Sequence, residues 1–407
     1  MSYYLYMTSI KRYRKQLIFV VLLLVIGSYA TYAFTKPLPA LLPSVTKLPS
    51  KAAQVITLPW PGYGEAAVGA VGYGVLASSS SQTAIPTAST IKILTALAVL
   101  KQKPLTLNDD GPAITITQAD VDSYNKYVSE NGSVVNVQVG EQISEYQALQ
   151  AMLLPSANNM AETLARWAYG SLDAYNTAAN QFAKQLGMSN TTVTDPSGFL
   201  PSTVSSAYDL TLLGEAALQN PVIAQIVAQT SANIPVQGTV HNVNQLLGEN
   251  SIVGIKTGNN DQDSGVFLFG ATHDVSGKTV TIVGAVMNAP DLGTVMHDSL
   301  PIITSAGGDF TVANVAHAGE VVGHYSLPWS KPIDVVVSKD VALLTWKGTA
   351  VTSSLNLQKL QAPVSTTKSA GNLTVQNSLD NSKTSVPVKL KQAITKPSWT
   401  WRLEHAF

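Results

Sequence analysis

The chain has 407 residues, enough for about two or three domains of ordinary size. Lysine plus arginine and aspartate plus glutamate balance at 25 each, so the charge gives no indication of a nucleic-acid partner. Cysteine is absent, which excludes disulfides, thiolate nucleophiles and cysteine-ligated zinc.

Residues 1–34 have the composition of an export signal. A basic patch, Lys11–Lys15, precedes an apolar run over Leu17–Phe34 that ends in small residues. This order predicts either a signal peptide, cleaved after Ala30 or less favourably after Ala33, or an uncleaved signal-anchor. The basic flank is expected to keep the N-terminus in the cytoplasm and to send the rest of the chain outside.

A proline-rich stretch, residues 35–55, is predicted to be a linker that leads away from the membrane. Alternating small and β-branched residues then predict a strand hairpin directly before a helix that carries Ser89. The pattern from Gln118 to Gly170 is mostly helical. A further helix is expected to begin at Ser206, because Ser206-x-x-Asp209 resembles a capping box.

The periodicity changes to that of strands after Ser251, in SIVGIKTG, SGVFLFGATHD and KTVTIVGAVMNA. Helices in the middle and strands at both ends predict an α/β domain over 56–309, whose sheet pairs early and late segments. Short strands and turns predict a separate all-β domain over 310–394. Residues 395–407 contain two tryptophans that could touch a membrane interface, but a loose tail is the favoured interpretation.

The Ser89 segment carries the first candidate catalytic pair. Ser89 and Lys92 are three residues apart on a helix and share one face. A serine near a helix N-terminus lies where backbone N–H groups favour developing negative charge. A neutral lysine amine within reach can accept the serine proton, so the pair indicates an activated nucleophile and its base.

Two further stretches strengthen this interpretation. Ser156 and Asn158 lie at a proline-marked break between helical segments, which can direct a hydroxyl and an amide into a cleft. Lys256 and Thr257 lie in a β-branched strand, and Gly258 would let a substrate backbone approach closely. Ser-x-x-Lys, Ser-x-Asn and Lys-Thr-Gly, in this order, match the signature of penicillin-binding proteins and class A β-lactamases.

The chain resembles the D-alanyl-D-alanine carboxypeptidase family, the low-molecular-mass penicillin-binding proteins, over about residues 55–394. The resemblance extends to PTASTIKILTAL, LGMSNTTVTDPSGF, SSAYDLTLLGEAAL and HAGEVVGHYSL. It implies a catalytic α/β domain of the β-lactamase/DD-peptidase type and a small C-terminal β-sandwich. It also implies an enzyme at the outer face of the bacterial cell membrane that trims peptidoglycan stem pentapeptides, needs no cofactor and is inhibited by β-lactams.

The resemblance implies roles at matching positions. Ser89 would be acylated, Lys92 would act as its base and Ser156 would shuttle a proton. Asn158 would bind substrate backbone, and Lys256 and Thr257 would hold the terminal carboxylate of the substrate. The backbone N–H groups of Ser89 and Asn259 would form the oxyanion hole.

The sequence departs from the family pattern in two places. Asn159-Met160 follows Ser-x-Asn where the family often has Asp-Ala. The strand KTVTIVGAV lacks an arginine that some members use to bind the carboxylate, so that task would rest more on Lys256 and Thr257.

Several alternatives stay open. A β-lactamase would need a deacylating glutamate, and the nearest stretch, Glu215–Asn220, has the wrong spacing. A catalytically inactive peptidoglycan-binding envelope protein is disfavoured by the intact nucleophile and base, and an endopeptidase would use the same residues. The pairs His273-Asp274 and His297-Asp298 are interpreted as solvated turn residues, and no metal-ligand spacing is present. Three glutamates are expected on exposed helix faces: Glu141, Glu145 and Glu162.

Overall fold

The computed structural model describes residues 2–79, 82–260 and 264–406. These residues form two compact units. The first comprises Met1–Ala53, Ala313–Leu344 and Thr349–Phe407, and the second comprises Gln54–Val312 and Thr345–Gly348. The proline-rich stretch after the N-terminal helix therefore belongs mostly to the same unit as the C-terminal residues.

The second unit is built on a five-stranded antiparallel sheet with the order β10-β11-β12-β2-β3. Strand β12 pairs with β2, with Ile282 opposite Ala70, so early and late segments share one sheet as predicted. The hairpin expected before Ser89 is β2 and β3. The bounds are β2 Glu65–Ala70, β3 Gly74–Ser78, β10 Ile252–Asn260, β11 Ser264–Val275 and β12 Lys278–Ala289.

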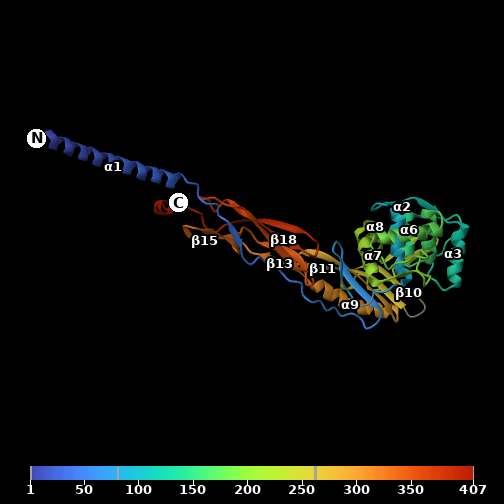
Figure 1. Cartoon of the computed structure of the whole chain (residues 1–407). Coiled ribbons are helices and arrows are strands. Elements are labelled where there is room, and N and C mark those ends of the chain that lie inside the picture. Colours follow the sequence, from blue (N-terminus) through green and yellow to red (C-terminus); the bar gives the residue numbers. More distant parts are fainter. Residues whose placement is uncertain (1, 80–81, 261–263, 407) are drawn as a thin grey trace. The chain divides into compact units, whose positions relative to one another are not determined.

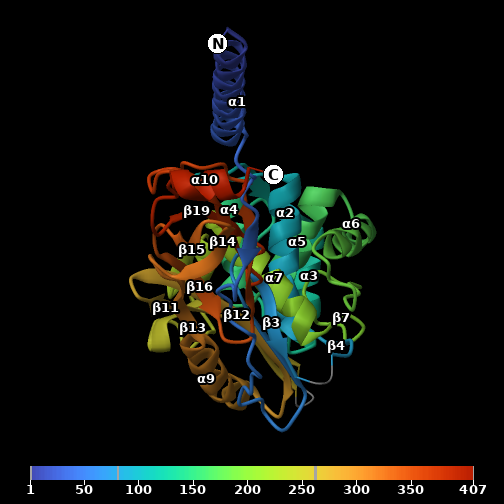
Figure 2. The same ribbon diagram turned by 60° about the vertical axis from the view of Figure 1, so that its left-hand side comes forward.

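Two helices pack on opposite faces of this sheet (Figure 2). Gly214 of α7 (Ala207–Gln219) lies against Leu268 of β11, whereas Gly307 of α9 (Leu292–Gly308) lies against His273 of the same strand. Residues separated by an odd number along a strand point to opposite faces, which places the two helices on either side. Helix α7 begins as predicted, with the Ser206 side chain accepting the N–H of Asp209 at 3.2 Å.

A helical region completes the second unit and includes the segments labelled α2, α3, α6 and α8 in Figure 1. Its core is apolar and continuous with that of the sheet, so the helices hold one another through buried leucine, alanine and methionine side chains. The helices are α2 Lys92–Gln102, α3 Gln118–Ser129, α4 Glu145–Leu153, α5 Asn158–Tyr169, α6 Leu172–Gln185 and α8 Pro221–Val227, with short 3₁₀ turns η1 Ala88–Ile91 and η2 Glu249–Ser251. Short antiparallel pairs join loops: β4 Ile85–Pro86 with β7 Val204–Ser205, β5 Ala113–Thr115 with β6 Gln142–Ser144, and β8 Ser231–Ile234 with β9 Gly238–His241.

The C-terminal region is rich in strands, as predicted. A six-stranded sheet has the order β1-β14-β15-β19-β18-β17, and β13 pairs with β16. Strand β1 comes from the stretch expected to be a linker and pairs Pro43 with Tyr325. The strands are β1 Pro43–Val45, β13 Phe310–Ala316, β14 Val321–Leu327, β15 Ser330–Val337, β16 Val341–Trp346, β17 Val351–Leu357, β18 Ser369–Asn377 and β19 Lys383–Leu390.

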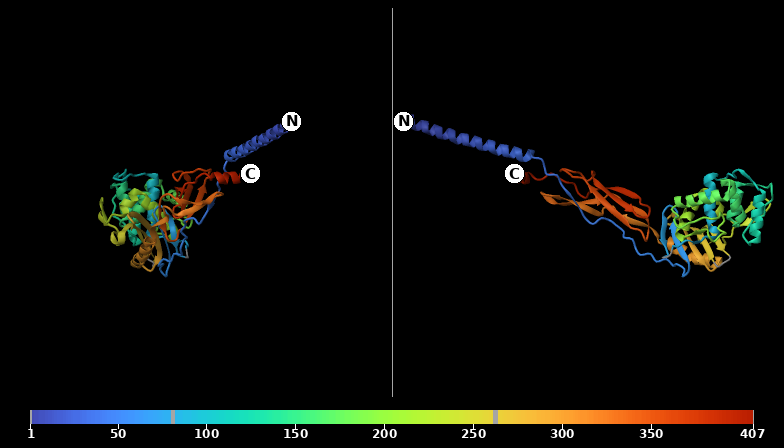
Figure 3. Two further views of the ribbon diagram at one scale, coloured as in Figure 1. Left: turned by 90° about the vertical axis from the view of Figure 1, so that its left-hand side faces the viewer. Right: turned by 45° about the vertical axis from the view of Figure 1, so that its right-hand side comes forward.

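The N-terminal helix α1 spans Ser2–Thr35, and its end lies close to the C-terminus of the chain (Figure 3). Among the described residues it is the one helix that is long and apolar enough to cross a membrane, over Ile10–Thr35. The expectation of a loose C-terminal tail is wrong, because Trp399–Glu404 form helix α10, which contacts α1. The Ser398 side chain accepts the N–H of Trp401 at 3.2 Å, which caps this helix.

Candidate active site

The structure brings Ser89 and Lys92 together at the junction of η1 and α2. Lys92 Nζ donates to Ser89 Oγ at 2.7 Å. It also donates to Asn158 Oδ1 at 2.7 Å and to the carbonyl oxygen of Ser197 at 2.8 Å. Three acceptors match the three donors of an ammonium group and hold the amine against the serine hydroxyl.

Lys92 lies in an unusual electrostatic environment. Its side chain is fully buried, and this burial lowers the pKa of Lys92 well below its ordinary value. The positive charge of Lys256 lowers that pKa further, whereas the Asp195 carboxylate raises it. A lysine with a depressed pKa can be neutral near physiological pH, which is the state in which it can accept the proton of Ser89.

Ser156 lies at the predicted break between the end of α4 at Leu153 and the start of α5, and Asn158 is the first residue of α5. Ser156 has a φ of 68°, a conformation uncommon for residues other than glycine. Its Oγ is buried and has no hydrogen-bond partner among the described residues. A buried hydroxyl without a partner is costly, so this group is available to a ligand or a reacting proton.

Asn159, the departure from the family pattern, has a structural role. Its Oδ1 accepts the N–H of Val135 at 3.1 Å, and its Nδ2 donates to the carbonyl of Val135 at 3.0 Å. Asn158 holds the same loop, because its N–H donates to the carbonyl of Ser133 at 2.7 Å. The asparagine pair thus fixes the loop between α3 and β6.

Lys256 and Thr257 lie on a strand as predicted, β10, which is at the edge of the sheet. Both side chains are buried, and Lys256 Nζ donates to the carbonyl oxygen of Thr257 at 2.9 Å. Burial lowers the pKa of Lys256 to about 7. Lys256 forms no salt bridge within the described part of the chain, so its charge is available to an anionic ligand.

Gly258 has a different surrounding from the one expected. A Cβ atom at this position would lie 2.9 Å from Ala88 Cβ and 3.0 Å from the backbone nitrogen of Ser89. The residue therefore lets β10 pass directly against the Ser89 segment, rather than only leaving space for substrate. The next residue, Asn259, has an exposed side chain.

Sequence reasoning missed the network that supports Lys92. Asp195 Oδ2 accepts from Ser197 N at 3.1 Å, Ser197 Oγ at 2.6 Å and Phe199 N at 3.0 Å, while Oδ1 accepts from Thr203 Oγ1 at 2.6 Å. These bonds fix the loop whose Ser197 carbonyl receives Lys92. The signal was the segment DPSG, in which an aspartate precedes turn residues.

The expectation that Glu145 and Glu162 lie on exposed helix faces is wrong. Glu162 is buried and accepts from Ser123 Oγ at 2.7 Å and from Tyr127 OH at 2.8 Å, and it pairs with Arg166 at 2.9 Å. Glu145 is also buried, and burial raises its pKa to about 7. Glu141 is half-buried. His273-Asp274 lies on β11 and His297-Asp298 lies on α9, rather than in turns.

Comparison with known proteins gives relatives of one kind. The chain is 38% identical over 165 residues to D-alanyl-D-alanine carboxypeptidase DacB2 of Mycobacterium tuberculosis, covering 40% of this chain and 52% of the relative. It is 36% identical over 152 residues to a D-alanyl-D-alanine endopeptidase of Pseudomonas aeruginosa, covering 37% and 46%. The chain thus spans about half the length of these curated relatives.

Solved structures give the same result. The crystal structure of the Streptomyces K15 DD-transpeptidase is 26% identical, with a TM-score of 0.55 over 62% of this chain and 99% of that one. Penicillin binding protein 5 from Haemophilus influenzae is 18% identical, with a TM-score of 0.59 over 84% of this chain and all of that one, and this likeness shows the fold alone. The sequence profile of D-alanyl-D-alanine carboxypeptidase matches residues 68–291, more than half of the chain, and the protein therefore belongs to the D-alanyl-D-alanine carboxypeptidase family.

Proposed function

We propose that this protein is a serine-type D-alanyl-D-alanine carboxypeptidase that removes the terminal D-alanine from peptidoglycan stem pentapeptides. The observation that carries the proposal is the buried amine of Lys92, 2.7 Å from Ser89 Oγ and lowered in pKa. Family membership supports the substrate class, and the geometry supports the roles of Ser89 as nucleophile and Lys92 as base.

The acylation step follows from this pair. Ser89 Oγ attacks the carbonyl carbon of the penultimate D-alanine, while the neutral amine of Lys92 takes the hydroxyl proton. The peptide C–N bond breaks, and the departing D-alanine nitrogen receives a proton, for which the unpartnered Ser156 hydroxyl is the candidate relay. Water then cleaves the ester and restores Ser89, with the same base receiving a proton from the water.

Substrate binding uses the remaining residues. The Lys256 ammonium and the Thr257 hydroxyl hold the terminal carboxylate, and Asn158 binds substrate backbone while its Oδ1 holds Lys92. The N–H groups of Ser89 and Asn259 stabilise the tetrahedral oxyanion, each worth roughly 3 kcal/mol by comparison with other oxyanion holes. Gly258 supports this arrangement by allowing β10 to approach Ser89.

Helix α1 supports a location at the outer face of the bacterial cell membrane. Ten consecutive apolar side chains, Leu17–Ile26, are each 51–65% exposed, so a lipid environment would bury a surface that is unfavourable in water. The basic flank Lys11–Lys15 orients the helix with its N-terminus in the cytoplasm. Residues 56–309 would be the catalytic domain, carried outside the cell, with 310–394 as a separate β-rich domain.

The alternative reactions differ in the leaving group or in the acceptor of the acyl group. Similar proteins are named carboxypeptidase, endopeptidase and DD-transpeptidase. A carboxypeptidase releases free D-alanine and transfers the acyl group to water. An endopeptidase also uses water but releases the peptide that was joined through the cross-link, and a transpeptidase transfers the acyl group to a second peptide amine. The buried Lys256 favours a substrate that ends in a free carboxylate, which is the carboxypeptidase substrate.

The test combines intact-mass spectrometry with product analysis on the full chain in detergent. Wild type is expected to gain one penicillin adduct and to release D-alanine from a pentapeptide, and Ser89→Ala to do neither. Lys92→Met should retain substrate binding but lose acylation by at least about 100-fold, because the general base is gone. Absence of an adduct with intact drug would indicate an inactive binding protein, and rapid hydrolysis of the drug would indicate a β-lactamase.

A further inference from the structure

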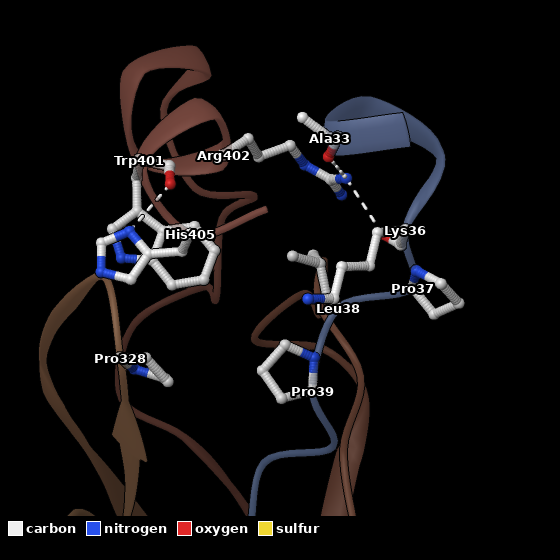
Figure 4. A pocket seen from close by; sticks show the side chains of 9 residues that line it. All are labelled: Ala33, Lys36, Pro37, Leu38, Pro39, Pro328, Trp401, Arg402 and His405. Atoms are coloured by element: carbon white, nitrogen blue, oxygen red, sulfur yellow. Dashed lines mark hydrogen bonds between the residues drawn. The ribbon is translucent and has the colours of Figure 1, made fainter. Parts of the chain in front are cut away.

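The first unit contains a pocket that the catalytic proposal does not use. It lies between the end of α1, the residues that follow it and helix α10, and its volume is about 300 Å³ (Figure 4). That volume is at the lower end of the range of ligand sites. The pocket is therefore large enough to hold a small ligand or part of a larger one.

Hydrogen bonds hold α10 onto the end of α1. Arg402 Nη1 donates to the carbonyls of Ala33 at 3.2 Å, Phe34 at 2.8 Å and Lys36 at 3.1 Å. These carbonyls belong to the last turn of α1 and the residues after it, where a helix carries partial negative charge. Tyr29 also donates to the carbonyl of Leu403, so the pocket is attached to the candidate membrane helix at several points.

The chemistry of the lining is cationic. Lys36, Arg402 and His405 contribute basic side chains, and none of the described residues that line the pocket is acidic. Lys36 Nζ donates to the carbonyl of Ala406 at 2.8 Å, which uses one of its three donors. All of the bonds that Arg402 makes to α1 run through Nη1, and a guanidinium carries five donors, so both cations retain capacity for an anionic ligand.

The aromatic groups beside these cations suit a membrane interface. Trp401 stacks on His405 with ring centroids 4.5 Å apart and packs edge-on against Trp329 at 5.3 Å. Trp401 Nε1 is buried and has no hydrogen-bond partner among the described residues, so a ligand oxygen would give it an acceptor. The neighbouring Trp399 is 67% exposed, as is typical of tryptophans at the headgroup level.

We propose that this pocket binds the phosphate group of an anionic phospholipid of the outer leaflet. The proposal rests on the proposed orientation of α1, which brings Lys36 and Arg402 to the level of the headgroups. Charge-assisted bonds from both cations would hold the phosphate, while Trp401 and the prolines of the lining would contact the glycerol and the first methylene groups. The lipid would thereby tie the C-terminal end of the chain to the membrane surface.

The test uses the full chain in nanodiscs that contain equal amounts of phosphatidylglycerol and phosphatidylcholine. After extraction, native mass spectrometry should show one phosphatidylglycerol retained by wild type. Arg402→Gln and Lys36→Gln should each lower retention by about tenfold or more, because each removes a charge-assisted bond. Lys396→Gln, which removes an exposed cation outside the pocket, is the matched control and should retain the lipid as wild type does.

Four outcomes would overturn the proposal. Equal retention of both lipids, or wild-type retention in both pocket variants, would show that the pocket does not select an anionic headgroup. Binding of inorganic phosphate without retention of any lipid would show a site for a free anion instead. An intact mass that corresponds to a chain beginning after Ala30 or Ala33 would show that most of α1 is cleaved from the mature chain. Penicillin acylation of Ser89 in the same sample would still report on the proposed activity.

Discussion

Lys256 makes the rate depend on pH through its own protonation state. Its pKa is lowered to about 7 by burial, and in the proposed mechanism it binds the substrate carboxylate only as the cation. As pH rises through 7 in the free enzyme, the cation is lost, so kcat/KM for a carboxylate-ended peptide should fall above that pH. The measurement is kcat/KM against pH for the natural pentapeptide and for its C-terminal amide.

The amide lacks the carboxylate, so kcat/KM for the amide should be lower than for the acid. It should not show the fall above pH 7, because protonation of Lys256 no longer affects binding. Lys256→Arg should also abolish the fall, because a guanidinium stays charged at these pH values. A falling limb of equal size for the acid, the amide and the arginine variant would assign the titration to another group.

Asp195 should act as a positioning residue for Lys92, through the loop whose Ser197 carbonyl accepts from Lys92. Asp195→Asn replaces a carboxylate that accepts four hydrogen bonds, so we expect a loss of about 1–3 kcal/mol in stability. The negative charge also raises the pKa of Lys92, so its removal should lower that pKa further. The rising limb of the pH profile for acylation should therefore move to lower pH.

A purely structural role would change the melting temperature without moving that limb, which separates the two explanations. Asp122→Asn, an exposed change on α3, is the control for loss of a carboxylate. An unshifted limb in a folded Asp195→Asn enzyme would contradict the assignment.

At the level of elements, the contact between β10 and η1 would set the geometry of the proposed oxyanion hole. Gly258→Ala would place a Cβ 3.0 Å from Ser89 N, so the strand or the nucleophile segment must shift. We expect about 1–3 kcal/mol of destabilisation and a slower second-order rate of penicillin acylation. Gly62→Ala is the control, because a Cβ there meets nothing within 4 Å; equal rates in the two variants would contradict this role.

The elements were predictable where their signals are local. Strand alternation gave the β2–β3 hairpin, and the Ser206 cap gave the start of α7. The surroundings of Gly258 were not predictable, because its neighbours come from a segment about 170 residues earlier in the chain. Glu162 was misassigned for the same reason, since its partners on α3 become neighbours only when the helices pack.

For the whole chain, the sequence predicted an α/β domain and a strand-rich C-terminal region, because each has its own periodicity. It also predicted a signal peptide or signal-anchor over 1–34, where the structure has helix α1. It did not predict that residues 35–55 contribute β1, or that the last residues form α10. Both depend on partners more than 250 residues away: β14 for β1 and α1 for α10. Local composition cannot report such pairings.

The docking of α10 should make the end of α1 depend on the C-terminus. Lys36 N–H bonds to the carbonyl of Tyr32 at 2.9 Å, and Arg402 occupies the exposed carbonyls around it. Deleting residues 397–407 should therefore increase amide hydrogen exchange over residues 31–36, because helix ends without a cap fray. Residues 17–26 should stay protected in the same detergent micelle, and Glu404→Gln, an exposed change on α10, should leave both regions unaltered. Unchanged exchange over 31–36 after the deletion would mean that α1 ends at Thr35 through its own local preference and that α10 only rests beside it.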